Sequence, residues 1–257
     1  MKKFLALLLI SLMLCSVFAS CSADDFDVDA DENGDAAEVD LDALPESSAG
    51  LEFALNSDGK GYTLTGIGSC TDKNIVIGKY NGLPVTDTKF MALSGCTEIT
   101  SLTIGDGVER IGTFSFGGCR NIETLKIGKN VKVIDDNAFQ DCDALVTLTI
   151  PGNVKSVCDG SFQESSNLTE VVFEKGFEQI TGKAFLQCTR LKSVTFNLGV
   201  TKLSARAFEG CSSLEEIKFN GTKAQWESIE KEDGWDRYTG DYVVKCSDGD
   251  IAKTNLD

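Results

Sequence analysis

Apolar residues recur every 23 positions from about Ile99 to Phe219. The period is clearest in a column of phenylalanines: Phe116, Phe139, Phe162, Phe185 and Phe208. A cysteine column keeps the same interval, with Ser165 as its one exception: Cys96, Cys119, Cys142, Cys188 and Cys211. Several columns in register over five or six copies predict a solenoid of stacked coils, because one repeat lies on the next.

One copy, residues 122–145, predicts the structure of a coil. Leu125 and Ile127 flank a polar residue, and this alternation is typical of a half-buried strand. The run from Ala138 to Leu145 carries apolar residues at intervals of about three, which favours a short α or 3₁₀ turn. Such a coil cannot bury its own apolar residues, so each coil needs neighbours about 4.8 Å above and below.

The chain divides around these repeats at 99–219. Residues 51–98 are predicted to form an N-terminal cap with a first irregular repeat, beginning with a hairpin. Residues 220–257 are predicted to form a C-terminal cap with a short helix near Trp226 and a last strand at 242–244. Four aromatic residues gather in this second cap: Trp226, Trp235, Tyr238 and Tyr242. They either plug the end of the core or offer a binding surface, and the position at a solenoid end favours the plug.

The segment before the repeats has a different composition. Residues 1–20 have a basic pair followed by an apolar run that is too short to span a membrane, which indicates a secretory signal. Residues 21–50 contain eleven acidic and no basic residues, so a disordered, solvated tether is expected. A calcium-loop-like pattern runs from Asp29 to Asp40, but Asp40 stands where such a loop needs Glu, and a plain linker is the favoured interpretation.

Two resemblances follow from these motifs. The patterns L-x-x-L-x-[IF] and A-F-x-x-C-x-x-L resemble the BspA-like class of bacterial surface leucine-rich repeats over about 51–252. That resemblance implies an α/β solenoid with a parallel β-sheet on one face, short helical turns on the other, and caps at both ends. It also implies adhesion or another protein interaction at the cell surface. Val17 to Cys21 is similar to a bacterial lipobox, which implies that Cys21 is acylated and anchors an exported protein in a lipid bilayer.

The sequence lacks the residues and motifs of several common catalytic, metal-binding and cofactor-binding sites. There is no histidine, which removes the usual Ser-His-Asp and Cys-His nucleophilic arrangements and every histidine-containing metal site. The formal charge of −16 and the lack of a basic patch argue against nucleic acid as a partner. No cofactor motif is present, so we expect a binding protein and not an enzyme.

Binding is expected on the outer face of the sheet, where the residues between the apolar positions point to solvent. The candidate positions are Thr103, Lys126, Thr149, Val172, Thr195 and Lys218. Threonine is also simply a good strand residue, so each position alone is weak evidence. Two other functions stay open: a spacer without a specific ligand, and a carbohydrate-binding accessory protein that uses the terminal aromatics. The column cysteines are expected to be buried thiols, although stacked coils would also bring them within disulfide range.

Overall fold

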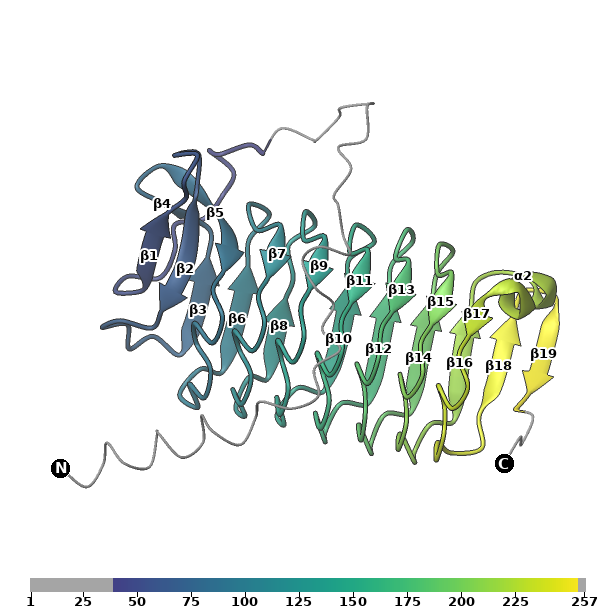
Figure 1. Cartoon of the computed structure of the whole chain (residues 1–257). Helices are drawn as coiled ribbons and strands as arrows, with labels where there is room; N and C mark the ends of the chain where they lie inside the picture. The colour runs from purple at the N-terminus through teal and green to yellow at the C-terminus, as the bar shows by residue number, and fades with distance from the viewer. Residues whose placement is uncertain (1–38, 254–257) are drawn as a thin grey trace, which may run out of the picture. The chain divides into compact units, whose positions relative to one another are not determined.

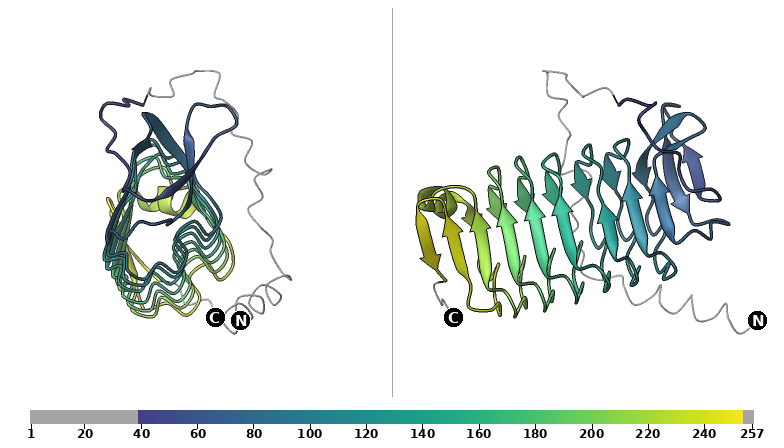
Figure 2. Two further views of the ribbon diagram at one scale, coloured as in Figure 1. Left: turned by 90° about the vertical axis from the view of Figure 1, so that its left-hand side faces the viewer. Right: turned by 180° about the vertical axis from the view of Figure 1, so that it is seen from behind.

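The computed structural model of the chain describes residues 39–253. The predicted signal segment, Cys21 and the calcium-like residues before Val39 lie outside the described residues. Within the described part, the chain winds into a β-solenoid of about eight turns (Figure 1). Seen along the solenoid, successive coils follow nearly the same path (Figure 2).

Two sides of each coil are strands. The long strands form the first side: β3 (Asn74–Ile77), β6 (Ser101–Ile104), β8 (Thr124–Lys126), β10 (Thr147–Ile150), β12 (Glu170–Phe173), β14 (Ser193–Phe196), β16 (Glu216–Phe219) and β18 (Val243–Cys246). The second side contains β5 (Leu83–Thr88), β7 (Arg110–Ile111), β9 (Val133–Ile134), β11 (Ser156–Val157), β13 (Gln179–Ile180), β15 (Lys202–Leu203) and β17 (Glu230–Lys231). Leu148 pairs with Val171 and Val171 with Val194 in parallel register, which confirms the period of 23 as the step from one coil to the next.

The core confirms the predicted stacking of like residues. The five column phenylalanines are fully buried, at 0% exposure. Their rings stack almost parallel, with centroids 5.1 Å apart between Phe116 and Phe139 and 5.2 Å between Phe139 and Phe162. The next ring centroids are 5.5 Å apart between Phe162 and Phe185 and 5.2 Å apart between Phe185 and Phe208. Each such ring contributes about 1.5–3 kcal/mol by leaving water, so this file is a main source of stability.

The third side of the coil differs from the prediction, because its residues form turns instead of short helices. Asn137 and Asp141 have φ of 54° and 56°, a left-handed conformation that a right-handed helix excludes. The amides of Asn137, Phe139 and Asp141 donate to carbonyls of the next coil at 2.7–3.0 Å. Only the amides between them, such as that of Gln140, bond three residues back within the coil. Hydrogen bonding between coils therefore replaces the expected helical bonds.

The long strands do not form one continuous sheet, contrary to expectation. They separate into β3-β6-β8 and a second sheet that starts at β10, whereas the other side stays continuous from β5 to β17. In later coils, the residue after the strand donates its amide to the preceding coil, as Glu174 does to the carbonyl of Ile150 at 2.9 Å. Pro151 occupies this position after β10 and has no N–H to donate. The sheet thus divides beside a proline.

The N-terminal residues correct the extent of the predicted tether. Residues 39–50 were expected to be solvated, but Leu44 is only 5% exposed. The amides of Ser47 and Ser48 donate to the carbonyls of Lys79 and Val76, both at 2.9 Å, so the segment runs along the first coil. The predicted hairpin is present as the antiparallel strands β1 (Glu52–Leu55) and β2 (Tyr62–Gly66). Because β2 pairs with β5, the hairpin extends the sheet instead of covering the end of the solenoid.

The C-terminal end contains the predicted helix and last strand. Helix α2 (Lys223–Ser228) begins with a capping box in which Thr222 and Gln225 exchange hydrogen bonds at 2.9 and 3.3 Å. Strand β18 turns back through β19 (Gly249–Ala252), which pairs with it antiparallel. A concavity of about 950 Å³ lies at this end among residues of the last coil. No helix among the described residues is both long and apolar enough to span a bilayer.

Candidate binding surface

The six predicted sheet residues lie on the outer face of the long strands. Lys126, Thr149 and Lys218 are exposed, and the other three, Thr103, Val172 and Thr195, are partly exposed. Their neighbours inside the coil, such as Leu148 at 2%, are buried because side chains alternate across a strand. The strands that bear these residues form two groups of consecutive partners, β6 and β8 before the break at Pro151 and the other four strands after it. The larger group is Thr149, Val172, Thr195 and Lys218 on β10, β12, β14 and β16.

The side chains on this outer face are mostly polar, and many of them are small. A second row beside the first contains Thr124, whose Oγ1 donates to Ser101 Oγ of the preceding coil at 2.9 Å. Toward the C-terminal end the row becomes charged, with Lys218 Nζ 3.1 Å from Glu216 Oε1. Exposed ion pairs of this kind add little stability. The face therefore offers hydroxyls and charges at fixed spacing, which suits hydrogen bonding to an extended ligand.

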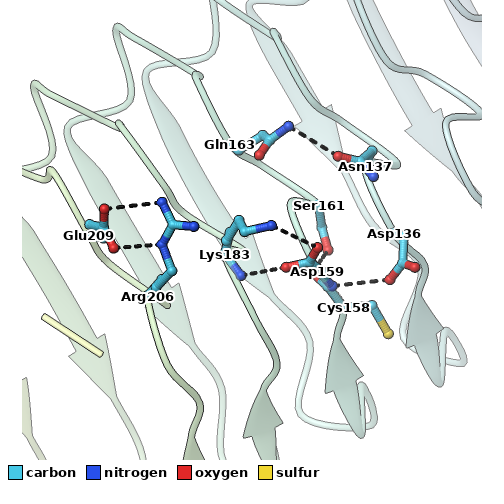
Figure 3. A network of polar contacts seen from close by, with 9 residues as sticks. All are labelled: Asp136, Asn137, Cys158, Asp159, Ser161, Gln163, Lys183, Arg206 and Glu209. Carbon is cyan, nitrogen blue, oxygen red and sulfur yellow. Dashed lines mark hydrogen bonds and ion pairs between the residues drawn. The ribbon is translucent and has the colours of Figure 1, made fainter. Parts of the chain in front are cut away.

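A second polar surface, which sequence reasoning missed, runs along the turns (Figure 3). Asp136 accepts a hydrogen bond from the amide of Asp159 at 3.1 Å, and Asp159 accepts one from the amide of Lys183 at 2.7 Å. In the following coil, Arg206 holds Glu209 through two bonds of 2.7 and 3.1 Å. The bonds of Asp136 and Asp159 link one coil to the next and hold the turns in register, whereas the bonds between Arg206 and Glu209 lie within one coil.

The start of this surface contains acidic side chains whose negative charge is only partly balanced by a nearby cation, Arg110. Arg110 Nε lies 2.7 Å from Asp135 Oδ2, and Asp135 is only 5% exposed. Burial raises the pKa of Asp87 to about 6, against the opposing effect of Arg110. Burial also raises the pKa of Asp136 to about 6, and the carboxylates of Asp159 and Asp135 raise it further. Among residues 39–253, no group of three acidic, cysteine or histidine side chains is arranged to hold a metal ion.

Four of the five column cysteines are buried thiols that bond to the preceding coil, and Cys96, in the first of these coils, is partly buried. Cys119 Sγ donates to the carbonyl of Leu93 at 3.1 Å, and Cys211 Sγ donates to that of Phe185 at 3.2 Å. Burial raises the pKa of the Cys119 and Cys188 thiols to about 12, so they stay protonated and unreactive near neutral pH. Ser165 occupies the same column, and its buried hydroxyl has no hydrogen-bond partner.

The terminal aromatics divide into two kinds. Trp226, Trp235 and Tyr242 are 5–8% exposed, in agreement with the prediction that they plug the core. Trp235 packs edge-on against Phe208, the last ring of the phenylalanine file, with centroids 6.1 Å apart. Tyr238 is different, because it is 72% exposed. The fold and its surfaces thus define a leucine-rich-repeat-like β-solenoid with two solvent-facing candidates for binding, the outer sheet face and the C-terminal concavity.

Comparison with known proteins agrees with this description. Six copies of the BspA type leucine rich repeat region match residues 86–228, and the chain belongs to this family. No curated protein sequence matches the chain.

Solved structures include similar proteins. The leucine rich repeat protein of T. pallidum is 26% identical over 66% of this chain and 83% of that protein, with a TM-score of 0.60. A leucine rich cell surface protein from Faecalibacterium prausnitzii A2-165 is 20% identical over 73% of this chain and 72% of that one, with a TM-score of 0.42. A leucine-rich repeat protein from Bacteroides ovatus ATCC 8483 is 17% identical over 71% and 65%, with a TM-score of 0.35.

Proposed function

We propose that this protein is a membrane-anchored surface protein that binds a protein partner through the outer face of its long strands. The observation that carries the proposal is the run of solvent-facing positions on β10, β12, β14 and β16, held in parallel register by a rigid stacked core. Solenoids present extended surfaces of this kind to their ligands. Membership in the BspA type family supports a binding scaffold over an enzyme.

The partner we expect is a protein with an extended, polar segment. The face carries hydroxyl groups at Thr149 and Thr195 and a charged pair at Glu216 and Lys218, and it lacks large apolar anchors. Affinity therefore depends on many weak hydrogen bonds at a fixed spacing. A single bulky charge in the middle of the face is expected to disrupt such binding, because it blocks close approach along several strands.

The test uses two arginine substitutions at exposed threonines. Thr149→Arg lies on the outer face, and Thr201→Arg is the matched control on the side of the short strands. The full-length chain and both variants are immobilised and exposed to purified extracellular-matrix proteins and bacterial surface proteins. We expect at least one protein to bind, about tenfold more weakly to Thr149→Arg and equally well to Thr201→Arg. A spacer role is favoured if no protein on the panel binds, and equal loss in both variants contradicts the assignment of the face.

Anchoring is proposed to depend on acylation of Cys21. Two or more acyl chains are needed for stable anchoring, because each buried CH₂ contributes about 0.8 kcal/mol. The chain with its own N-terminal segment is expressed in a bacterium that is fed labelled palmitate. We expect label in the wild-type chain and its recovery with membranes, whereas Cys21→Ser removes both. A wild-type chain that is unlabelled and recovered in the soluble fraction contradicts the anchor.

A further inference from the structure

The C-terminal end of the solenoid contains a concavity of about 950 Å³ that the sheet-face function does not use. Its floor contains apolar groups of Trp235, Val244 and Ile251, and its rim carries charged side chains and Tyr238. We propose that this concavity binds an uncharged oligosaccharide, with Tyr238 as the stacking platform. The site is separate from the outer sheet face and does not depend on the function proposed for that face.

The position of Tyr238 in the repeat gives the first argument. The amide of Gly210 donates to the carbonyl of Arg237 at 2.9 Å, so Tyr238 takes the place in the last coil that Gly210 takes in the coil before it. The φ of Tyr238 is 58°, and Asp141, Glu164 and Gln187 hold the same column in earlier coils with φ of 56°, 61° and 59°. The left-handed turn is therefore a regular feature of this column, which tyrosine adopts less easily than glycine does. What distinguishes the last coil is an aromatic ring at a position that is glycine or polar in the earlier coils.

The exposure of Tyr238 gives the second argument. At 72% exposure the ring adds little to the core, so packing does not account for its presence. The other aromatic faces are less available, since Lys231 Nζ lies 4.6 Å from the Trp226 ring and Lys253 Nζ lies 5.5 Å from the Tyr242 ring. Arg237 Cζ lies farther from the Tyr238 ring, at 6.0 Å, and Tyr238 is the most exposed of the four aromatic residues at this concavity, so it is the ring best placed to stack on a ligand.

The charge of the rim selects the ligand class. Three cations, Lys231, Arg237 and Lys253, are balanced by three carboxylates, Glu232, Asp233 and Asp236. A balanced rim favours neither an anion nor a cation, but it offers both donors and acceptors of hydrogen bonds. A pyranose ring has an apolar face that stacks on an aromatic ring and hydroxyls around its edge. Neutral sugars therefore match the apolar floor and the mixed rim, and the volume falls within the usual range for ligand sites.

The test measures glycan binding and stability in the same variants. The full-length chain is titrated calorimetrically with cellohexaose, maltohexaose, xylohexaose and chitohexaose as neutral probes, and with heparin and hyaluronan as anionic probes. We expect binding of at least one neutral probe, weakened about tenfold by Tyr238→Gly. The same substitution is expected to raise the melting temperature by about 1–4 °C, because it releases the left-handed strain.

Matched controls separate the site from the rest of the fold. Met91→Gly also replaces an exposed residue with a left-handed φ, of 57°, but near the other end of the chain, and it should leave glycan binding unchanged. Thr149→Arg should also leave it unchanged, so failure of the sheet-face function is distinguishable from failure of this one. The proposal is overturned by full binding in Tyr238→Gly, by binding of the anionic probes alone, or by no binding of any probe.

Discussion

The last coil is longer than the interior coils and contains helix α2, but its turn forms the same hydrogen bonds with different side chains. The amide of Phe185 donates to the carbonyl of Ala207, and the amide of Phe208 donates in the same way to that of Trp235. A tryptophan thus stands where the preceding coil has alanine, and Tyr238 stands where it has Gly210. Inside the stack, a neighbouring coil restricts every side chain to the size of its column. At the end there is no next coil, so large side chains are accommodated in a turn that keeps the hydrogen bonds of the repeat.

The largest expected change in stability comes from removing one ring from the buried column of phenylalanines. Phe139→Ala removes a fully buried ring that stacks on Phe116 and Phe162, and it should lower the free energy of unfolding by about 3–5 kcal/mol. Chemical denaturation measures the change. Phe90→Ala is the matched control, because Phe90 is 60% exposed and its loss should change stability by less than about 0.5 kcal/mol. A loss below about 1 kcal/mol in Phe139→Ala contradicts the core placement.

A smaller change, an increase in stability, is expected when the buried carboxylate of Asp136 at the turns is made neutral. Asp136→Asn keeps an oxygen that can accept the amide of Asp159, and it removes a carboxylate that is 8% exposed. The pKa of Asp136 is about 6 in the folded chain against a usual 3.8, so the folded state binds the proton more tightly. The carboxylate therefore lowers stability as pH rises from about 4 to 6, and the full penalty remains above that range.

Removing this group should raise the free energy of unfolding at pH 7–8 by about 1–3 kcal/mol and leave stability below pH 4 almost unchanged. Denaturation at a series of pH values tests both parts of this prediction. Asp248→Asn, on an exposed turn near the C-terminal end, serves as a control. An Asp136→Asn variant with the pH dependence of the wild type would show that burial does not perturb this carboxyl group.

The smallest effect is expected in the cysteine column. Ser165→Cys replaces a buried hydroxyl that lacks a partner with a thiol whose longer C–S bond reaches the carbonyl of the preceding coil, as at Cys142. It should raise the free energy of unfolding by about 1 kcal/mol. The reverse change, Cys142→Ser, should lower it by about 1–3 kcal/mol, because a polar group is then buried without a partner. A stabilising effect of Cys142→Ser would contradict this account of the column.

The sequence predicted what the 23-residue period controls directly. Strand positions, coil register, the phenylalanine file and the outward direction of Thr149 follow from apolar alternation, since burial decides them. The turn conformation did not follow from apolar spacing, because that spacing does not reveal the sign of φ. A signal was present in Gly95, Gly118 and Gly210, which share one column and all have positive φ.

Three other features depended on details outside the repeat columns. The break in the long-strand sheet depends on the missing N–H of Pro151. The docking of residues 39–50 depends on Leu44, one apolar residue in an acidic segment. The acidic cluster brings together Asp87 and Arg110, which pair in one column, and Asp135, which lies two positions further along in the next coil. The place of Tyr238 in the glycine-containing column was not predicted, because Tyr238 lies beyond the last regular repeat.

A double-mutant cycle on the phenylalanine file measures the stacking of like residues most directly. Alanine substitutions at Phe139 and Phe162, singly and together, should show a coupling free energy of about 0.5–1.5 kcal/mol, because their centroids are 5.2 Å apart. The same cycle on Phe116 and Phe208, four coils apart in the file, should show additive effects within about 0.5 kcal/mol. Additivity in the adjacent pair, or equal coupling in both pairs, would contradict the stacked solenoid.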